Sequence, residues 1–549
     1  MRRIFLKISI AFTFISLVFT SCETTDLDLL ENPNEINTEK ANIDRFLNQI
    51  QIDFASFMYQ IGDNASELTR IDYMFGRTYE NNYQPAVLNG LWATAYSGHL
   101  ADIAAALPLA EEVGLNKHAG IMKVLKGYTY ITLVDNFGDV PFSQANQATD
   151  FPQPVADSGS SVYEGAIQLI NEGISLLVTD GPELEYDFYY NNDASKWIKL
   201  ANSVKMQAYL ALGDYSSFNA IASDTDSFIN NSANDFQFQY GTTVIPDQLD
   251  TRHPTYQGDY TGTGVGSYRA NWIMDEMLNS NDPRRFFYFF RQVSCTPGAT
   301  CDPDGDQEFL TCSVTAAPNH YPAGMVFCSV EDGYWGRDHG NAEGIPPDRF
   351  KRTASGVYPA GGKYDKGSFG SVIPGSGGGG AGIMPIMLSS FTKFMRAEVA
   401  MAAQNYSQAS SLLENALNDS TNKVVNFGTV DATADPNDFP TASEIQNFIS
   451  STITSFNGAN PEGKWEILAK QNFITHYGNG LNPYNFYRRT GYPKTLQFNI
   501  EPNSGGFVRS FLYPANEANV NSNITQKPNV LVQVFWDTKP ASPGFPSAN

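Results

Sequence analysis

The chain has 549 residues, a formal net charge of −23 and an aromatic content of 13%. Its 58 acidic residues outnumber its 35 basic ones, which argues against a nucleic-acid partner, because phosphate binding needs clustered Lys and Arg. The same excess of acid argues against electrostatic docking to an anionic lipid surface. The many aromatic rings supply flat apolar faces of the kind that stack on sugars.

The N-terminus has the layout of a secretory signal peptide. A basic start, Arg2 to Lys7, precedes an apolar run from Ile8 to Thr20 that is too short to span a bilayer. Small residues then precede Cys22, in an arrangement that resembles a bacterial lipobox. We therefore expect residues 1–21 to be a signal peptide and Cys22 to be lipidated, so that lipid alone holds the mature chain. An ordinary signal peptide cleaved nearby is the alternative.

Amphipathic helices are expected over much of the chain, because apolar residues recur there with helical spacing. The expected helices cover residues 43–61, 88–112, 121–133, 162–178, 194–212, 389–404, 406–417, 442–455 and 462–476. Several form pairs joined by short turns, and one carries small residues on one face, as in tetratricopeptide-like pairs. The fold class predicted is mostly α: degenerate tetratricopeptide-like helical pairs with a large loop-rich irregular region and little strand.

The segment from about 235 to 385 differs from the helical regions. It is rich in Gly, Pro, Tyr and Asp and has no helical period, which predicts a loop-rich insertion with a functional role. A short strand is predicted at Val530–Trp536. No linker divides the chain, so residues 22–549 are predicted to form one body.

Four cysteines cluster inside this insertion. Cys295, Cys301, Cys312 and Cys328 form an even set in an exported chain, which predicts two disulfides. Three pairings are possible, and closure between neighbours, 295 with 301 and 312 with 328, is our prediction. The absence of a CxxC spacing disfavours a zinc site.

Three alternating carboxylates lie between these cysteines. Asp302, Asp304 and Asp306 resemble the first part of an EF-hand loop, but Gln307 stands where that loop needs Gly and Ser313 replaces its closing Glu. We interpret the segment as a solvated acidic turn, with Ca²⁺ binding as the minor alternative. No other cofactor is expected.

Candidate ligand-binding residues are aromatic rings that lie in loops beside polar donors, a mixture that suits sugars. The first group lies between two expected helices and contains Tyr73, Phe75, Arg77, Tyr79, Asn82 and Tyr83, with Trp92 close behind. The second group, Tyr334 and Trp335, lies in the insertion. Burial in the core is the alternative for each ring.

Catalytic motifs are lacking. The sequence contains no HExxH, no GxSxG and no phosphate-binding GxxxxGK[ST], and nothing singles out the carboxylate pair that a glycosidase needs. We therefore predict a protein that is not an enzyme.

Several motifs, in order along the chain, are similar to those of one family. The strongest is YRRTGYP at Tyr487–Pro493, which is followed by RSFLYPANE at Arg509–Glu517. DNFGDVPFSQA at Asp135–Ala145 matches a turn that follows a tetratricopeptide helix, and KWIKLANS at Lys196–Ser203 is a further match. Pro385–Met387, which leads into Phe394–Glu398, and Gly356–Gly362 add to the set. The chain thus resembles SusD/RagB-type nutrient-binding outer-membrane lipoproteins.

This resemblance implies eight helices in four tetratricopeptide-like pairs beneath a loop-rich region. It also implies a place on the outer membrane at the cell surface and a partner, a SusC-like TonB-dependent transporter barrel. The implied function is capture of a nutrient, most often an oligosaccharide, for transfer to that barrel. A peptide receptor of the same family, a lid whose cargo is bound mainly by the barrel, and an exported glycan-active enzyme are the alternatives. The Arg-rich and GDVP motifs are expected to be scaffold, because bidentate Arg contacts and a Gly-Pro turn have structural uses.

Overall fold

The computed structural model describes residues 42–295, 310, 312, 315–343, 348–540 and 545–548. The described residues do not include the signal peptide, Cys22, Cys301 or the candidate calcium ligands Asp302, Asp304 and Asp306, so the hypotheses about these residues stay predictions. Residues Ile43–Asn549 form one compact unit. In the part that the structure describes, no helix is both long and apolar enough to cross a membrane.

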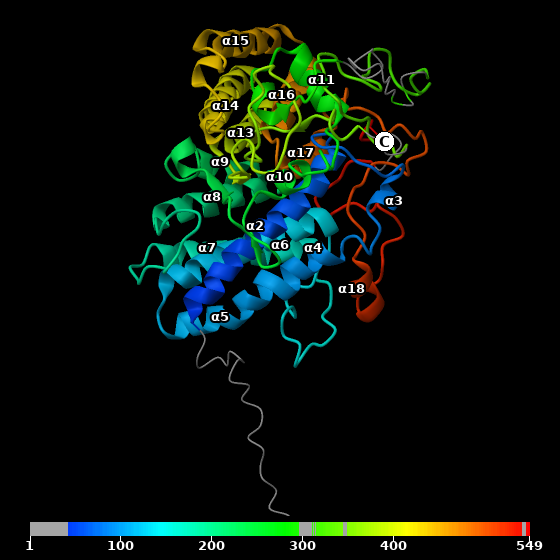
Figure 1. The fold of residues 1–549 in the computed structure, drawn as a ribbon. Helices are drawn as coiled ribbons and strands as arrows, with labels where there is room; N and C mark the ends of the chain where they lie inside the picture. The colour runs from blue at the N-terminus through cyan, green and yellow to red at the C-terminus, as the bar shows by residue number, and fades with distance from the viewer. Residues whose placement is uncertain are drawn as a thin grey trace, which may run out of the picture. The chain divides into compact units, whose positions relative to one another are not determined.

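Helices dominate the first half of the unit, as the apolar spacing predicts (Figure 1). They are α2 (Ile43–Leu68), α3 (Tyr79–Asn82), α4 (Asn89–Ala93), α5 (Leu100–Glu112), α6 (Asn116–Phe137), α7 (Gly159–Leu177), α8 (Ala194–Leu212) and α9 (Tyr215–Ala222). Consecutive helices α6, α7, α8 and α9 pack against one another, which is the pairwise arrangement expected. Asp193 caps α8 by accepting hydrogen bonds from two backbone N–H groups, and Gly213 ends it in the left-handed conformation.

Glycines let α6 and α7 approach closely. A Cβ on Gly127 of α6 would lie 2.6 Å from Ile170 Cγ1 and 2.8 Å from the Ala166 carbonyl oxygen of α7. A Cβ on Gly173 of α7 would lie 2.8 Å from the Gly120 carbonyl oxygen of α6. The contact between these two helices therefore depends on backbone positions without a side chain.

A second group of helices follows the insertion. It comprises α13 (Ser389–Ala402), α14 (Tyr406–Phe427), α15 (Ala442–Gly458), α16 (Pro461–Thr475), α17 (Leu481–Thr490) and α18 (Ala515–Val520), with 3₁₀ turns η4 (Gly428–Val430) and η5 (Pro436–Asp438). Helices α13 and α14 pack as a pair around the predicted turn, where the Asn405 side chain caps α14 by accepting from Gln408 N–H. Thr441 and Glu444 form a capping box at the start of α15.

Short elements separate these two helical groups. They are the 3₁₀ turn η2 (Ser232–Asn234), the helices α10 (Pro254–Asp259), α11 (Asn271–Asn279) and α12 (Arg285–Tyr288), and the strands β1 (Phe236–Gln239), β2 (Val244–Ile245), β3 (Leu249–Asp250), β4 (Phe289–Phe290), β5 (Ala354–Ser355) and β6 (Ile383–Met387). The strands pair antiparallel as β1–β6, β2–β3 and β4–β5. Because β1 opens the predicted insertion and β6 closes it, their pairing brings both ends of the insertion together on the helical scaffold.

One local prediction is wrong, and one confirmed helix contains a kink. Val530–Trp536 is not a strand; it is irregular, and the Trp536 indole N–H donates to the Asp135 carboxylate at 2.9 Å. The helix expected over 88–112 is interrupted by a π-helical turn, η1 (Thr94–His99), in which Gly98 has φ −94° and ψ −120°. Apolar periodicity does not reveal such an interruption, because the residues on either side keep their helical spacing.

The two strongest motifs meet in the core as scaffold. Arg488 is fully buried, and its Nη2 donates to the Asp135 carbonyl oxygen at 2.7 Å, while Nη1 donates to the Arg509 carbonyl oxygen at 2.6 Å. Gly138 has φ 78° and ψ −120°, a positive-φ conformation at the end of α6 that Gly adopts without a steric penalty. The RRTGYP and GDVP motifs are therefore structural, as predicted.

Cys312 and Cys328 form one of the predicted disulfides. Cys295 is also disulfide-bonded, and its partner lies outside the described residues.

Candidate ligand-binding sites

The structure divides the predicted ring-bearing loop 73–83 into exposed and buried residues. Phe75 is 53% exposed, Arg77 is exposed and Tyr73 is half-buried. Tyr79 and Tyr83, in contrast, are fully buried. Tyr83 Oη donates to Glu67 Oε2 at 2.8 Å.

Asn82 is held by the same carboxylate, since its Nδ2 donates to Glu67 Oε2 at 2.8 Å. The Tyr79 hydroxyl accepts from Arg70 Nη2 at 3.1 Å. These contacts, and the gain from removing large rings from water, fix Tyr79 and Tyr83 as packing residues, while the half-buried Asn82 keeps its ligand-binding role as a prediction.

The second predicted group lies in the core. Tyr334 and Trp335 are 1% and 2% exposed, and the Trp335 indole N–H donates to the Cys295 carbonyl oxygen at 2.7 Å. Neither ring presents a face to solvent. Burial corrects the prediction of a ring-stacking role for both residues, as it does for Tyr79 and Tyr83.

The two predicted loops nevertheless meet. Gly340 N–H donates to the Met74 carbonyl oxygen at 3.0 Å, and the Tyr73 hydroxyl donates to the Asn341 carbonyl oxygen. Phe75 and Arg77 therefore lie on a loop that the insertion holds in place. Their ligand-binding role stays a prediction.

Trp92 belongs to a cleft of about 330 Å³, here called the Trp92 cleft. Its apolar lining comprises Trp92, Tyr96, Phe151, Val520 and the prolines Pro141, Pro152 and Pro154. Its polar lining is mostly amide: Asn146, Gln147, Gln153, Asn516 and Asn521. Rings with a few convergent polar groups are the usual composition of a small-molecule site.

Packing fixes the ring wall of this cleft. Trp92 on α4 and Tyr96 on η1 have centroids 4.6 Å apart and planes 34° apart, and Phe137 meets the indole edge-on at 5.2 Å. The Tyr96 hydroxyl donates to the Pro141 carbonyl oxygen at 2.8 Å. Burial raises the pKa of that hydroxyl, so it remains a neutral donor.

The rim of the Trp92 cleft is polar but almost uncharged. Asn146 Nδ2 donates to the Tyr96 carbonyl oxygen at 2.7 Å, which attaches the loop after Pro141 to the ring wall. Phe151 is 39% exposed on the same loop. Glu517 is the one charged residue among the described lining residues, and its carboxylate accepts from Asn521 Nδ2 at 2.8 Å. A neutral ligand with flat apolar faces and hydroxyl groups fits this lining.

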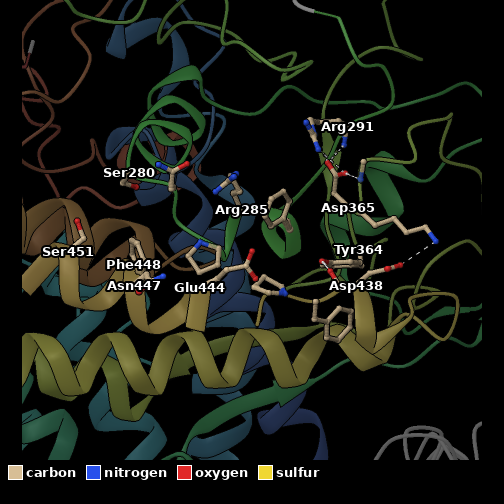
Figure 2. Close-up of a pocket in the computed structure, with 17 residues that line it drawn as sticks. Ser280, Arg285, Arg291, Tyr364, Asp365, Asp438, Glu444, Asn447, Phe448 and Ser451 are labelled. Carbon is tan, nitrogen blue, oxygen red and sulfur yellow. Dashed lines mark hydrogen bonds and ion pairs between the residues drawn. The ribbon is translucent and has the colours of Figure 1, made fainter. Parts of the chain in front are cut away.

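A larger cavity of about 610 Å³ lies between α15 and the turns around α12, here called the Arg285 cavity. Glu444, Asn447, Phe448 and Ser451 recur at helical spacing, so one face of α15 forms a wall of the cavity (Figure 2). Further lining residues are Ser280, Asn281, Pro283, Arg285, Phe286, Arg291, Tyr364, Asp365, Lys366, Gly367, Asp438, Phe439 and Pro440.

Most charges in the Arg285 cavity are paired. Arg291 donates to both oxygens of the buried Asp365 carboxylate, at 2.7 and 3.2 Å. Lys366 lies 3.5 Å from Asp438. Hydrogen bonds from Thr441 lower the pKa of Glu444 below its usual range, so this carboxylate is not suited to act as a general acid.

A third cavity of about 30 Å³ lies among acidic residues beside Arg269. Arg269 contacts Asp72 at 2.9 Å and Asp259 at 3.2 Å, so its charge is compensated. The volume suits about one or two waters and excludes a sugar. Within the described part of the chain, no group of three His, Cys, Asp or Glu residues is placed to hold a metal ion.

Comparison with known proteins identifies the family. Residues 33–308 match the family model SusD-like_2, described as "Starch-binding associating with outer membrane". Residues 382–535 match the SusD-like model, described as "Susd and RagB outer membrane lipoprotein". The chain belongs to the SusD/RagB family. No curated protein matches it.

Solved structures share the fold. A SusD/RagB family protein from Bacteroides thetaiotaomicron is 17% identical with a TM-score of 0.64, covering 91% of this chain and 100% of that one. A chitin-binding SusD homolog from Flavobacterium johnsoniae is 16% identical with a TM-score of 0.60, covering 91% and 99%. A SusD homolog from Bacteroides fragilis is 17% identical with a TM-score of 0.59, covering 89% and 99%.

Sequence reasoning included Trp92 but missed its neighbours in the cleft. Tyr96 follows Trp92 by four residues, which on a helix places both rings on one face and was a usable signal. Phe151 and Asn516 come from segments far away in the sequence, and no local pattern connects them with Trp92.

Proposed function

We propose that this protein is a cell-surface receptor, without catalytic activity, that captures an oligosaccharide and passes it to a SusC-like TonB-dependent barrel. Membership of a family described as starch-binding and outer-membrane associated supports this function. The chitin-binding protein among the structural neighbours supports a sugar as the cargo. The proposed attachment is a lipid on Cys22.

The composition of the Trp92 cleft carries the proposal. Its ring wall, amide rim and lack of Lys or Arg among the described lining residues match an uncharged sugar. Sugar hydroxyls would exchange hydrogen bonds with Asn146, Gln153 and Asn516, while a pyranose face packs on the exposed Phe151 ring. Such contacts give modest affinity, which suits a receptor that must release its cargo.

Calorimetric titration of the mature chain without lipid, residues 23–549, against chitooligosaccharides and starch oligosaccharides tests this function. We expect saturable binding to one of these sugar classes, and we expect the bound oligosaccharide to be recovered without hydrolysis. Phe151→Ala removes an exposed ring and is expected to weaken binding about fivefold to tenfold. Phe350→Ala is the matched control, because Phe350 is 49% exposed and lines neither cavity.

Four outcomes would each contradict one part of the proposal. Hydrolysis of the ligand would refute the non-enzymatic role. Binding of peptides but of no sugar would refute the cargo class. Equal effects of Phe151→Ala and Phe350→Ala on sugar binding would refute the location of the site. Co-purification with a SusC-like barrel from the native outer membrane tests the partner, and its consistent failure would refute the transfer step.

A further inference from the structure

We propose that the Arg285 cavity is a second ligand site, which binds an anionic saccharide through the Arg285 guanidinium. The cavity is separate from the Trp92 cleft, since the two share no lining residue. Its volume of about 610 Å³ is nearly twice the 330 Å³ of the cleft. It falls within the usual range for small-molecule sites.

Arg285 is held in position without an acidic partner. Its Nη1 donates to the Asp282 carbonyl oxygen at 2.9 Å, and its guanidinium carbon lies 4.3 Å from the centre of the Phe286 ring. No carboxylate of a described residue lies within ion-pair distance of it. The guanidinium is half-buried, and these contacts hold one of its edges. Its other N–H groups have no hydrogen-bond partner among the described residues and are parallel, which is the geometry that binds the two oxygens of a carboxylate or sulfate.

The other two cations in the cavity are each paired with a carboxylate. Arg291 is bound to Asp365, and Lys366 lies beside Asp438. The Glu444 carboxylate accepts from both the backbone and the hydroxyl of Thr441 and stays ionised, so it is the lining carboxylate that no cation of a described residue pairs with. Among the described lining residues, Arg285 is therefore the cation that has no carboxylate partner. One acidic group on a ligand would form an ion pair with it.

The other lining residues supply the polar and apolar groups that bind a saccharide. Figure 2 shows Arg285 between Ser280 and Tyr364, and it shows Asn447 and Ser451 along α15. The side chains of Asn447 and Ser451 are exposed and make no hydrogen bond to the described residues, so they are free to bind hydroxyl groups. The half-buried Phe286 and Phe439 rings supply apolar faces. A sugar that carries a carboxylate or a sulfate combines all three requirements.

The overall charge of −23 opposes approach of an anion from a distance. Selection must then come from the short-range guanidinium contact, which is screened less by salt than the long-range repulsion. Binding is accordingly expected to persist, or to strengthen, as salt is raised from low concentration. A purely electrostatic surface contact would weaken instead.

The test is calorimetric titration of the mature chain with four probes: an oligogalacturonate, a sulfated chondroitin oligosaccharide, chitotetraose and inorganic sulfate. We expect at least one of the two anionic saccharides to bind. Arg285→Gln should weaken that binding about tenfold or more, because a hydrogen bond to a charged group is lost. Arg349→Gln makes the same change in charge at an exposed arginine outside the cavity and should have no effect.

A second variant covers the case in which Arg285→Gln disturbs the fold. Asn447→Asp places a negative charge on the exposed face of α15 inside the cavity and leaves the Arg285–Asp282 contact intact. Asn447→Asp should weaken binding of the anionic saccharide by a similar factor. Phe151→Ala, in the Trp92 cleft, should not affect it.

Absence of binding by both anionic saccharides would overturn the inference. So would binding that is insensitive to both Arg285→Gln and Asn447→Asp, or binding of sulfate alone as tightly as of the saccharide. None of these results affects the proposed receptor function, which depends on sugar binding that Phe151→Ala weakens.

Discussion

Arg489 on α17 binds Glu398 on α13 through two parallel hydrogen bonds, Nε to Oε1 and Nη2 to Oε2, each 2.8 Å long. The two side chains are 15% and 6% exposed. Both residues lie in motifs that carry the family resemblance, 91 positions apart. A bidentate pair of this kind fixes orientation as well as distance, so it constrains how α17 is oriented relative to α13.

Glu398→Gln is expected to lower the free energy of unfolding by about 2 kcal/mol or more, because it leaves the largely buried Arg489 without its counter-charge. Chemical denaturation followed by circular dichroism measures the change. Lys494→Gln is the control, since its ion pair with Glu462 at 3.2 Å is exposed and should contribute under about 1 kcal/mol. A loss no greater for Glu398→Gln than for the control would contradict the structural role of this pair.

Gly127→Ala tests the close contact between α6 and α7. The added methyl would lie 2.8 Å from the Ala166 carbonyl oxygen, which is backbone and cannot rotate away. Crowding of this kind costs about 1–3 kcal/mol, offset in part by the gain of about 1 kcal/mol for Ala over Gly in a helix. We expect a net destabilisation, read as a lower melting temperature.

Gly90→Ala on α4 is the matched control for this prediction. Nothing lies within 4 Å of a Cβ at Gly90, so only the helix-propensity gain remains and stability should stay level or rise. Equal responses at Gly127 and Gly90 would show that α6 and α7 do not need the close approach.

Local chemistry explains which parts of the fold could be predicted from the sequence. The long helices follow from apolar spacing, and Gly138 and Arg488 belong to motifs whose turn and bidentate chemistry is specified over a few residues. The irregular segment Val530–Trp536 shows the limit of this reasoning. Its apolar residues look like a strand, yet Trp536 donates to the Asp135 carboxylate, and the Val530 carbonyl oxygen accepts from Arg509 N–H at 2.7 Å without a paired strand.

The candidate site was less predictable, because ring exposure in a loop has no periodicity. Phe75 and Tyr79 lie four residues apart in the predicted loop, and Phe75 is exposed while Tyr79 is buried at the start of α3. The Arg285 cavity joins the turn around Asn281, the segment near Tyr364 and the face of α15. Long-range packing brings these segments together, and no local sequence motif predicts that packing.

Glu67→Gln is expected to flatten the dependence of stability on pH. Burial raises the pKa of Glu67, with the neighbouring Asp63 charge as the second cause. The folded state therefore holds its proton at pH values where the unfolded state has lost it, and stability falls as pH rises above the usual Glu pKa of 4.5. The slope from this group is at most about 1.4 kcal/mol per pH unit.

Gln at position 67 is neutral and keeps an oxygen that can accept from both Tyr83 and Asn82. Unfolding measured at several pH values between 5 and 8 gives the difference between variant and wild type, in which most other groups cancel. A constant difference across this range would refute the raised pKa.

His99 is predicted to make stability fall as pH decreases, the opposite of the effect of Glu67. Burial lowers its pKa to about 3, and the neutral ring lies 2.9 Å from Thr129 Oγ1 and 3.1 Å from the Thr94 carbonyl oxygen. Below the usual His pKa of 6.5, the unfolded state takes up a proton that the folded state excludes. Stability therefore falls as pH falls from 6.5 towards 3. At pH 5 this group alone should cost about 2 kcal/mol relative to neutral pH.

His99→Gln retains a donor and an acceptor but cannot be protonated, so it should lose less stability than the wild type between pH 6.5 and 5. The two windows overlap between pH 5 and 6.5, where the effects of Glu67 and His99 have opposite signs, so each variant is compared with the wild type separately. If the wild-type and His99→Gln curves run parallel below pH 6.5, His99 is not held neutral by burial.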